Sequence, residues 1–261
     1  MAQTAFVTGS SSGIGRGAAL ALAQVGYNVA VHCGTSVTKA EEVAHEIEAM
    51  GRKAIVVRAD VKDLDQLNHA FDRVFAEFDT LDVLVNNAGI TKYRPFLEVT
   101  DEFFHEILYT NLRSHYFATQ RAAKNMIERG VKGRIITVTS VQQEICLPEA
   151  SIYGGFKAAL FKMVKHEAME LAPYGIRVNA VAPGTIKVND NPVTDREKQF
   201  ASRTPITRLG YPVDVAPAIV FLADSEKSSF MTGMCMMIDG GQYVPCLCDN
   251  TFVDRVPPIM K

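Results

Sequence analysis

The most informative absences from this 261-residue sequence are those of long apolar and long basic runs. The uncharged stretch over residues 17–38 is interrupted at Gln24 and Asn28, so it predicts a buried helix followed by a buried strand and not a membrane span. A net charge of −2 without a basic run argues against nucleic acid as the main partner. The first four residues lack the basic lead of a secretory signal. We therefore expect a cytoplasmic protein that binds a small molecule and neither a membrane nor nucleic acid.

Cysteine is scarce and scattered, and no Cys-x-x-Cys pair occurs. The odd count of five predicts reduced thiols and not a disulfide framework. The six histidines show no metal-binding spacing, and no histidine lies near the closely spaced Cys246 and Cys248. We expect these two to be ordinary thiols of the C-terminal tail, and we expect no metal site.

Internal repeats and linkers are also absent, and the length fits one large α/β domain. Short apolar segments alternate with helical patterns, which indicates a parallel sheet covered by helices on both faces. Strands are expected at 5–7, 29–31, 54–57, 83–85, 134–139, 177–181 and 235–238, and helices after Gly15 and at 39–50, 64–78, about 101–129 and 151–171. The fold class is therefore α/β, with a single doubly wound Rossmann domain over residues 1–261. Within it we expect an irregular substrate lid at about 184–212 and a tail at 242–261.

A glycine-rich loop follows the first expected strand and leads into an Ala- and Leu-rich helix. Strand, glycine turn and helix are the arrangement that places a pyrophosphate on a helix N-terminus. Gly9 would allow the tight turn, Gly13 would let the backbone approach the phosphates, and Gly15 would let helix and strand pack closely. The loop thus predicts dinucleotide binding, with cofactor contacts at Gly9, Ser11, Ser12, Gly13, Ile14 and Gly15.

A tyrosine and a lysine four residues apart provide the predicted proton chemistry. Tyr153 and Lys157 would lie on one helix face, one turn from each other. A free phenol has a pKa of roughly 10, and a neighbouring cation is expected to lower it toward the working pH. Ser140 ends an apolar strand pattern, and its hydroxyl would hold a substrate oxygen beside the phenol. These groups move a proton on or off an alcohol or ketone oxygen, so the hydride needs a cofactor.

Together these motifs resemble the short-chain dehydrogenases/reductases of the non-extended type over roughly residues 4–241. The resemblance is carried by the Gly9 loop, Asp60-Val61, Asn86-Asn87-Ala88-Gly89, Asn111, Ser140, Tyr153-x-x-x-Lys157, Pro183-Gly184 and Asp239-Gly240-Gly241. It implies that Tyr153 is the general acid/base, that Lys157 lowers its pKa and binds the nicotinamide ribose, and that Ser140 orients the substrate oxygen. Asn111 would hold a water that connects Lys157 to solvent.

The same resemblance implies further cofactor contacts. Asp60 and Val61 would flank the adenine, and Asn87, Ala88, Gly89, Pro183, Gly184 and Ile186 would line the cofactor. Where the family often carries a Thr that holds the carboxamide, this chain has Val188, so Thr185 or a backbone group would serve instead.

The end of the second expected strand bears on the choice between NAD and NADP. An NAD enzyme of this fold usually has a carboxylate there, whereas this chain has Cys33, Thr35 and Ser36, with the next acid at Glu41. Nothing in this segment repels a 2′-phosphate, although Ser12 stands where NADP enzymes often carry a basic residue. We predict a preference for NADP(H), with use of NAD left open.

The substrate is expected to be a sugar. The 183–186 and 203–210 segments look most like bacterial sugar dehydrogenases of the glucose and rhamnose type, which oxidise an aldose at C1. Candidate substrate contacts are the polar side chains of Gln142, Gln143, Glu144 and Asn189. The alternative interpretation, left open here, is that these side chains are merely exposed loop residues.

Three other functions stay open at this point. A 3-oxoacyl reductase shares nearly the same motifs, whereas a steroid or bile-acid reductase fits the polar pocket candidates less well. A non-catalytic nucleotide-sensing protein on the same fold would usually have lost the Tyr, Lys or Ser, and all three are present.

The two long helices are expected to build a homotetramer, or at least a dimer, because their apolar content exceeds what one sheet face needs. Phe104, Tyr116, Phe117 and Phe161 are among the residues concerned. The tail contains Tyr243 and Phe252 and is too apolar for a solvated end, so we expect it to pack on a neighbouring subunit.

Overall fold

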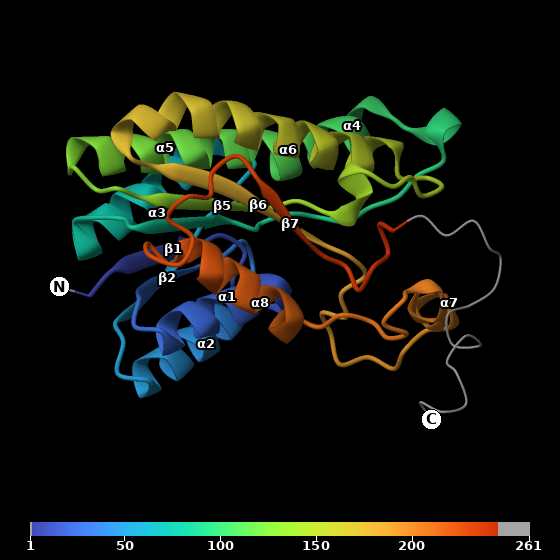
Figure 1. Ribbon diagram of the computed structural model, residues 1–261, viewed down its shortest axis with the longest axis horizontal. Helices are drawn as coiled ribbons and strands as arrows, with labels where there is room; N and C mark the ends of the chain where they lie inside the picture. The colour runs from blue at the N-terminus through green and yellow to red at the C-terminus, as the bar shows by residue number, and fades with distance from the viewer. Residues whose placement is uncertain (1, 245–261) are drawn as a thin grey trace.

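The computed structural model describes residues 2–244, and these form a seven-stranded sheet in which all neighbouring strands are parallel. The strand order is β3-β2-β1-β4-β5-β6-β7 (Figure 1). The strands are β1 (Thr4–Val7), β2 (Asn28–Cys33), β3 (Ala54–Arg58), β4 (Val83–Asn86), β5 (Arg134–Val138), β6 (Arg177–Pro183) and β7 (Cys235–Ile238). The order reverses between β1 and β4, where a doubly wound sheet opens a crevice at its carboxyl edge. The predicted fold class is confirmed.

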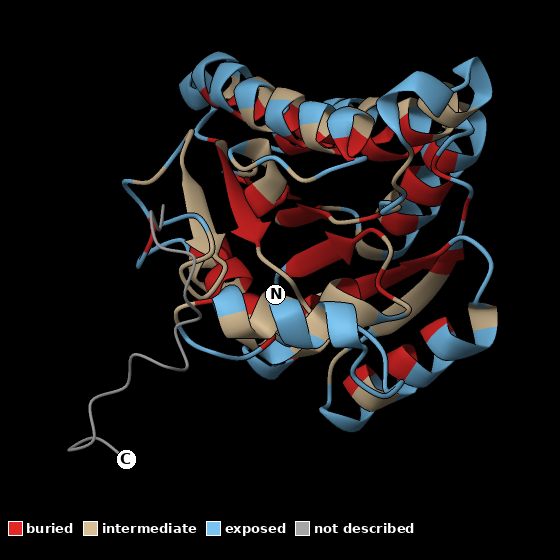
Figure 2. Cartoon of the chain, turned by 90° about the vertical axis from the view of Figure 1, so that its right-hand side faces the viewer, coloured by how far each residue is buried: buried red, intermediate tan, exposed pale blue. Residues whose placement is uncertain are grey.

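Helices cover both faces of the sheet (Figure 1). One layer consists of α1 (Gly13–Gln24), α2 (Val37–Ala49) and α8 (Pro212–Ala223), and the other of α3 (Leu64–Phe78), α5 (Ser114–Glu128) and α6 (Ser151–Leu171). Successive strand residues point to opposite faces, so Ala5 and Val7 pack under the first layer and Phe6 under the second. Both faces are apolar for this reason, and Figure 2 shows central strands that are buried between helices with exposed outer sides, while the edge strands β3 and β7 are mostly of intermediate burial.

The expected helix over residues 101–129 is divided into three segments. These are α4 (Asp101–Ile107), a π-helical segment η2 (Leu108–Arg113) and α5. Two hydroxyls in this region bond to the carbonyl four residues earlier, from Thr110 to Glu106 at 2.7 Å and from Ser114 to Thr110 at 2.6 Å. Such back-bonding perturbs the regular helical ladder, and π segments are frequent at functional sites. Asn111 lies within this segment.

The 184–212 segment is not irregular throughout, which corrects the sequence-based expectation. It contains α7 (Asp195–Arg203), whose start is fixed by a reciprocal capping box between Thr194 and Glu197. The two ends of the segment meet in a parallel bridge between Ile186 and Gly210. In Figure 1, α7 stands apart from both helical layers, beyond the carboxyl ends of the strands.

Helix α8 was missed by the sequence analysis because it contains two prolines. Pro212 occupies the first turn, where its missing N–H costs nothing, and Pro217 lies inside the helix. The helix forms because its apolar face is buried against α1, with Val215, Ile219 and Leu222 fully buried.

Three short 3₁₀ turns complete the described structure: η1 (Phe96–Glu98), η3 (Val141–Gln143) and η4 (Ala172–Tyr174). None of the helices within residues 2–244 is long and apolar enough to cross a membrane. The predictions for Cys246, Cys248 and most of the tail concern residues outside the described range.

Candidate active site

The loop after β1 and the loop after β4 pack directly against each other at the point where the strand order reverses. Gly9 has φ of 64°, and a side chain there would reach within 2.9 Å of the Ala88 Cα. At Gly15 a Cβ would collide with the carbonyl oxygen of Gly9. The expected turn at Gly9 and the expected close packing at Gly15 are therefore both present, and only glycine fits either position.

Polar side chains hold these two loops together. The Thr8 hydroxyl accepts from the backbone N–H groups of Asn87 at 2.9 Å and Ala88 at 3.0 Å. In return the Asn87 amide donates to the carbonyls of Thr8 at 2.9 Å and Gly9 at 3.1 Å. Asn87 thus serves the backbone of the glycine loop as well as lining the cavity beside it.

Two buried histidines fix the outer sides of the same loops. His32 Nδ1 accepts from the Gly9 N–H at 2.9 Å while its Nε2 lies 3.0 Å from the Ala59 carbonyl. His115 Nε2 lies 2.6 Å from the Ala88 carbonyl. Burial lowers the pKa of His32 to about 4 and that of His115 to about 3, with Lys157 adding to the shift at His115. Both rings are therefore neutral, and each Nε2–H donates to its carbonyl.

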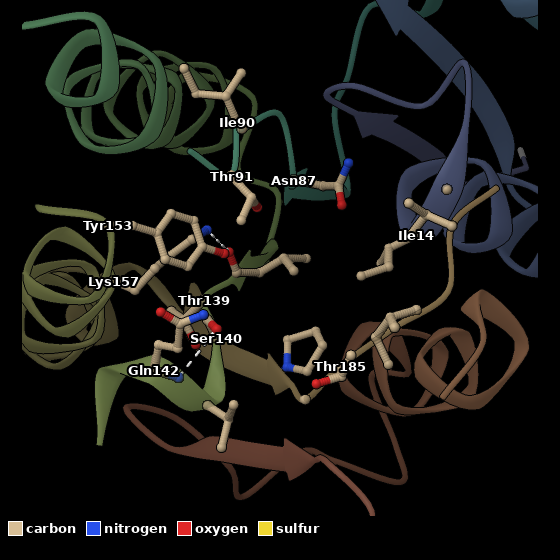
Figure 3. Close-up of a pocket in the computed structure, with 18 of the residues that line it drawn as sticks. Ile14, Asn87, Ile90, Thr91, Thr139, Ser140, Gln142, Tyr153, Lys157 and Thr185 are labelled. Atoms are coloured by element: carbon tan, nitrogen blue, oxygen red, sulfur yellow. Dashed lines mark hydrogen bonds between the residues drawn. The ribbon is translucent and has the colours of Figure 1, made fainter. Parts of the chain in front are cut away.

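A cavity of about 760 Å³ opens at the carboxyl ends of the strands. Its lining includes Gly9, Ser11, Ser12, Gly13, Ile14, Asn87, Ala88, Gly89, Ile90, Thr91, Tyr93, Ser140, Gln142, Tyr153, Lys157, Pro183, Gly184, Thr185, Ile186, Val188, Phe200, Arg203 and Gln242. Residues from both halves of the sheet and from α7 thus face one space. Part of this lining is shown in Figure 3.

Tyr153, Lys157 and Ser140 come together in this cavity, as the sequence predicts. Helix α6 carries the tyrosine and the lysine on one face, and Ser140 follows β5 at the start of η3 (Figure 3). The Lys157 ammonium donates to the Val138 carbonyl at 2.9 Å and lies 5.8 Å from the centre of the Tyr153 ring. All three residues are buried.

The pKa of the phenol differs from the sequence-based expectation. Burial raises the pKa of Tyr153 because the phenolate loses solvation, while hydrogen bonding to Thr91 and Ser140 acts in the opposite direction. Burial also lowers the pKa of Lys157 to about 8. In this structure the ammonium contacts a strand carbonyl, so the expected net lowering of the Tyr153 pKa by Lys157 is not found.

Asn111 uses its side chain on the loop after β4. Its amide oxygen accepts from the Ile90 N–H at 2.8 Å, and its amide nitrogen donates to the Ile90 carbonyl at 2.8 Å. The π segment therefore positions Ile90 and the adjacent Thr91 over the cavity. Both the oxygen and the nitrogen of the Asn111 side chain thus bond to Ile90, and the water that Asn111 was expected to hold stays a prediction.

The residues present fit a bound dinucleotide at the glycine-loop end. The first-turn N–H groups of α1 receive no capping bond from the Ser12 side chain, and Ser12, Gly13 and Ile14 face the cavity. An uncapped helix N-terminus with exposed N–H groups favours an anion such as a pyrophosphate.

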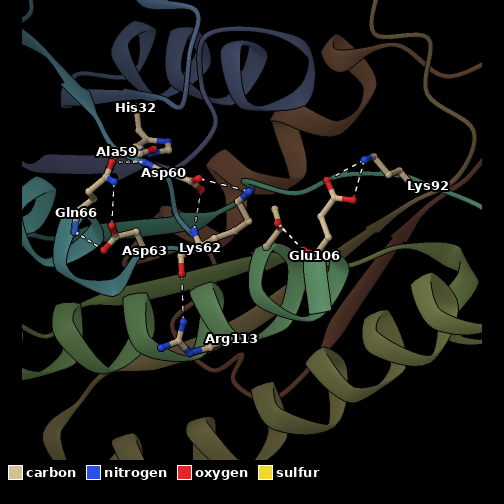
Figure 4. A network of polar contacts seen from close by, with 10 residues as sticks. His32, Ala59, Asp60, Lys62, Asp63, Gln66, Lys92, Glu106 and Arg113 are labelled. Carbon is tan, nitrogen blue, oxygen red and sulfur yellow. Dashed lines mark hydrogen bonds and ion pairs between the residues drawn. The ribbon is translucent and has the colours of Figure 1, made fainter. Parts of the chain in front are cut away.

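The predicted adenine contacts, Asp60 and Val61, and the residues expected near the ribose 2′-phosphate, Cys33, Thr35 and Ser36, lie outside the cavity lining. Cys33 is buried, whereas Thr35 and Ser36 are exposed beyond the end of β2. The carboxylate of Asp60 accepts from the Lys62 N–H at 3.0 Å and forms an ion pair with the Lys62 ammonium (Figure 4). Val61 next to it is buried.

Of the four predicted substrate contacts, Gln142 lines the cavity and the other three do not. Gln142 donates from its amide nitrogen to the Tyr93 hydroxyl at 2.9 Å, and its buried amide oxygen has no partner within residues 2–244. Gln143 points to the Cys235 sulfur at 3.6 Å, Glu144 is exposed, and Asn189 bonds to the Asn191 N–H.

Sequence reasoning missed several lining residues, namely Thr91, Tyr93, Ile145, Leu147, Phe200, Arg203 and Gln242. Thr91 and Tyr93 follow the Asn-Asn-Ala-Gly loop closely, so their proximity in sequence was an available signal. Gln242 is different, because it reaches Thr185 and Thr204 only through the tertiary fold.

Comparison with known proteins gives consistent matches along the chain. A family model described as enoyl-(acyl carrier protein) reductase matches residues 9–242. The L-rhamnose 1-dehydrogenase (NAD(P)(+)) of Azotobacter vinelandii is 41% identical and covers 93% of this chain and 97% of its own length. The chain belongs to the short-chain dehydrogenase/reductase family.

Two further relatives of this short-chain dehydrogenase/reductase differ in what their names describe. The 3-oxoacyl-[acyl-carrier-protein] reductase FabG of Staphylococcus aureus (strain Mu50) is 38% identical over 94% of this chain and 99% of its own. A short-chain dehydrogenase from Burkholderia cenocepacia J2315, solved in complex with NADP, has a TM-score of 0.86 and 35% identity, with 92% of this chain and 97% of that chain covered. The protein is thus an oxidoreductase that uses a nicotinamide cofactor to interconvert an alcohol and a carbonyl.

The geometry provides the protein's share of that chemistry. When bound, a nicotinamide supplies or accepts the hydride. The hydroxyls of Ser140 and Tyr153 come from different elements and face one space, so together they can hold a substrate oxygen. Tyr153 can then give a proton to that oxygen or take one from it.

The two neutral histidines predict a characteristic acid sensitivity. A histidine whose pKa is lower in the folded than in the unfolded state contributes stability that is fully present above the unfolded pKa, roughly 6.5, and is lost as pH falls toward the folded pKa. His115 has a folded pKa of about 3. Its contribution to the free energy of unfolding should therefore fall by about 1.4 kcal/mol for each unit by which the pH is lowered between roughly pH 6 and 4. His115→Asn should remove that slope in urea titrations at several pH values.

The control is His45→Gln on the exposed side of α2, which should leave the slope unchanged. Burial raises the pKa of Glu167 to about 7, so Glu167 contributes a pH slope of opposite sign in the same window. For this reason the effect of His115 is taken from the difference between wild type and variant and not from the wild-type profile alone. Parallel pH profiles for wild type and His115→Asn would contradict the assignment of a neutral buried ring.

Proposed function

We propose that the protein is an NAD(P)-dependent sugar dehydrogenase that oxidises an aldose at C1. The observation that carries the proposal is the buried amide oxygen of Gln142, which lies beside the Ser140–Tyr153 pair and has no partner within residues 2–244. A buried acceptor without a partner is costly unless a ligand donor meets it, and a sugar hydroxyl is such a donor. The rhamnose dehydrogenase of Azotobacter vinelandii supports this choice.

In this proposal the residues act as follows. Tyr153 takes the proton of the C1 hydroxyl, and Ser140 holds the same oxygen in place. Lys157 binds the nicotinamide ribose and keeps a positive charge near the phenol. Asn111 acts through Ile90, whose backbone it fixes.

A second candidate is a 3-oxoacyl reductase. It is favoured by the apolar part of the cavity wall, to which Ile145, Leu147 and Phe200 contribute, and by the resemblance to the Staphylococcus aureus reductase. An acyl chain would use that wall, whereas a sugar would use Gln142 and Tyr93.

A substrate panel separates these candidates. With L-rhamnose, D-glucose, a β-ketoacyl ester and a steroid, we expect turnover on aldoses, followed by the change in nicotinamide absorbance. Tyr153→Phe should lower kcat by at least about 100-fold, because the general acid/base is removed, while cofactor binding measured by calorimetry stays intact. Turnover on the ketoacyl ester with none on any aldose would select the second candidate, and full activity of Tyr153→Phe would point to a non-catalytic role.

We also propose that NADP is preferred over NAD. Arg58, the last residue of β3, donates to the Gly34 carbonyl at 3.3 Å and so lies next to the exposed Thr35 and Ser36. A guanidinium and two hydroxyls suit a ribose 2′-phosphate. Sequence reasoning named the hydroxyls but missed Arg58, which comes from the neighbouring strand.

Arg58→Gln should test this preference. Catalytic efficiency with NADPH is expected to fall about tenfold because one charge-assisted contact to the phosphate is lost, while efficiency with NADH changes less than about twofold. Lys53→Gln, just before the other end of β3, is the matched control and should affect neither cofactor. Equal losses with both cofactors, or a wild-type preference for NAD, would overturn the proposal.

We further propose a homotetramer that functions in the cytosol. Tyr109, Tyr116 and Phe117 are exposed along η2 and α5, and the Arg113 guanidinium lies over both the Tyr109 and the Phe117 ring, whereas Ile107, Leu160 and Val164 are buried in the protein's own core. Exposed aromatic patches of this kind are typical of subunit interfaces. The free thiols of Cys33, Cys146 and Cys235 suit a reducing compartment.

Light scattering at micromolar concentration should therefore give a mass of four chains, and at least of two. Tyr116→Lys together with Phe117→Lys should reduce the mass, because two buried charges oppose association. Lys124→Glu, on an exposed part of α5, serves as the control. A wild-type monomer would refute the proposed assembly.

A further inference from the structure

Helix α7 turns one face toward the cavity, and that face carries two arginines. Arg196, Phe200 and Arg203 are spaced at i, i+4 and i+7, so they lie along one side of the helix. Phe200 and Arg203 line the cavity, and the Arg196 guanidinium lies 5.7 Å from the centres of both the Tyr93 and the Phe200 rings.

This face lies at the substrate end of the cavity. The Tyr93 ring, over which Arg196 lies, packs edge-on against the Tyr153 ring with their centres 6.1 Å apart. Arg196 is therefore separated from the reactive phenol by one aromatic ring. Arg203 precedes Thr204, whose hydroxyl bonds to Gln242 at 2.8 Å on the cavity wall.

The acidic residues of α7 are occupied elsewhere. Asp195 forms an ion pair with Lys198 at 2.9 Å, and Glu197 with the buried Lys187 at 3.1 Å. Within residues 2–244 neither Arg196 nor Arg203 forms an ion pair or a side-chain hydrogen bond. The described cavity lining contains no Asp or Glu, and Lys157 adds a further positive charge to it.

From this arrangement we propose that the substrate carries an oxyanion, a carboxylate or a phosphate, which Arg196 and Arg203 bind on the side remote from the reacting carbon. Guanidinium groups bind both anions through paired N–H donors. In combination with the proposed sugar oxidation, on which this inference rests, the substrate class is an acidic sugar such as a uronate or an aldose phosphate.

The chemical step is the same as for a neutral sugar. The hydride leaves C1 for the oxidised nicotinamide, and the hydroxyl proton leaves for Tyr153 and then for solvent. A C1 carbonyl, part of a lactone, is formed. The anionic group takes no part in bond making, so the two arginines are specificity-determining residues and not catalytic ones.

Matched substrates test the proposal on the wild-type enzyme. D-glucose is compared with D-glucuronate and with D-glucose 6-phosphate, and D-galactose with D-galacturonate, at fixed NADP. We expect kcat/KM to be at least about tenfold higher for one class of anionic substrate, because a charge-assisted bond contributes that much or more. Preference for the uronates identifies a carboxylate, and preference for the phosphate identifies a phosphate ester.

Variants then locate the anion site. Arg196→Gln and Arg203→Gln should each lower kcat/KM for the preferred anionic substrate about 10- to 100-fold, mainly through KM, and leave the neutral aldose within about twofold. Arg203→Lys should restore part of the loss. Lys198→Gln, exposed and paired with Asp195 on the same helix, is the control and should change neither value.

Several results would overturn the inference while leaving the sugar assignment intact. These are a wild-type preference for neutral aldoses, equal losses on neutral and anionic substrates, or a rise in KM for NADP alone, which would place the arginines on the cofactor phosphates. No turnover on any sugar, charged or neutral, would instead refute the proposed function itself.

Discussion

The structure depends on the contact between the loop after β1 and the loop after β4, at the place where the strand order reverses. Thr8 and Asn87 exchange hydrogen bonds across this contact, and glycines at 9 and 15 remove the side chains that would separate the backbones. On their outer sides the loops are held by buried, neutral His32 and His115, which bond to Gly9 and Ala88. The contact sets the width of the crevice into which the cavity opens.

The buried lysine is the second constraint on the site. Desolvation disfavours its ammonium, and the Val138 carbonyl partly compensates by accepting a hydrogen bond. This bond links α6 to β5, so it also fixes Tyr153 relative to Ser140. The phenol in turn is shielded from water, which raises its pKa. The site therefore holds a neutral Tyr153 phenol close to the Lys157 ammonium, whose pKa of about 8 lies near neutral pH.

Substrate recognition is distributed differently from the chemistry. Ser140, Tyr153 and Lys157 lie on elements packed into the core, whereas the proposed specificity residues Arg196 and Arg203 lie on α7, outside both helical layers. Helix α7 is connected to the rest of the chain by the Lys187–Glu197 ion pair and the contact between Thr204 and Gln242. Substitutions on its cavity face can therefore alter substrate choice without disturbing the core, as is usual for functional segments on a stable scaffold.

The sequence by itself predicted the sheet, most of its helices and the convergence of Ser140, Tyr153 and Lys157 on one cavity. Apolar runs alternating with helical patterns allow few folds other than a parallel sheet with helices on both faces. Residues four apart on a helix share one face, so Tyr153 and Lys157 had to lie together once their segment was helical. It could not determine α8, whose prolines conceal a helix that is stabilised by burial against α1. It also could not determine the raised Tyr153 pKa, because desolvation depends on the surrounding elements.

Tertiary structure alone decided which polar residues meet. Gln142 reached the cavity while Gln143 and Glu144 did not, because the short turn η3 directs consecutive side chains in different directions. Arg58, Arg203 and Gln242 are far from Tyr153 and Lys157 in sequence, and they come to their places through a neighbouring strand, a helix outside the layers and the turn after β7. Local sequence patterns predict individual helices and strands, because hydrophobic periodicity is a short-range property of the chain. Convergence of side chains is a long-range property, and only the packed chain specifies it.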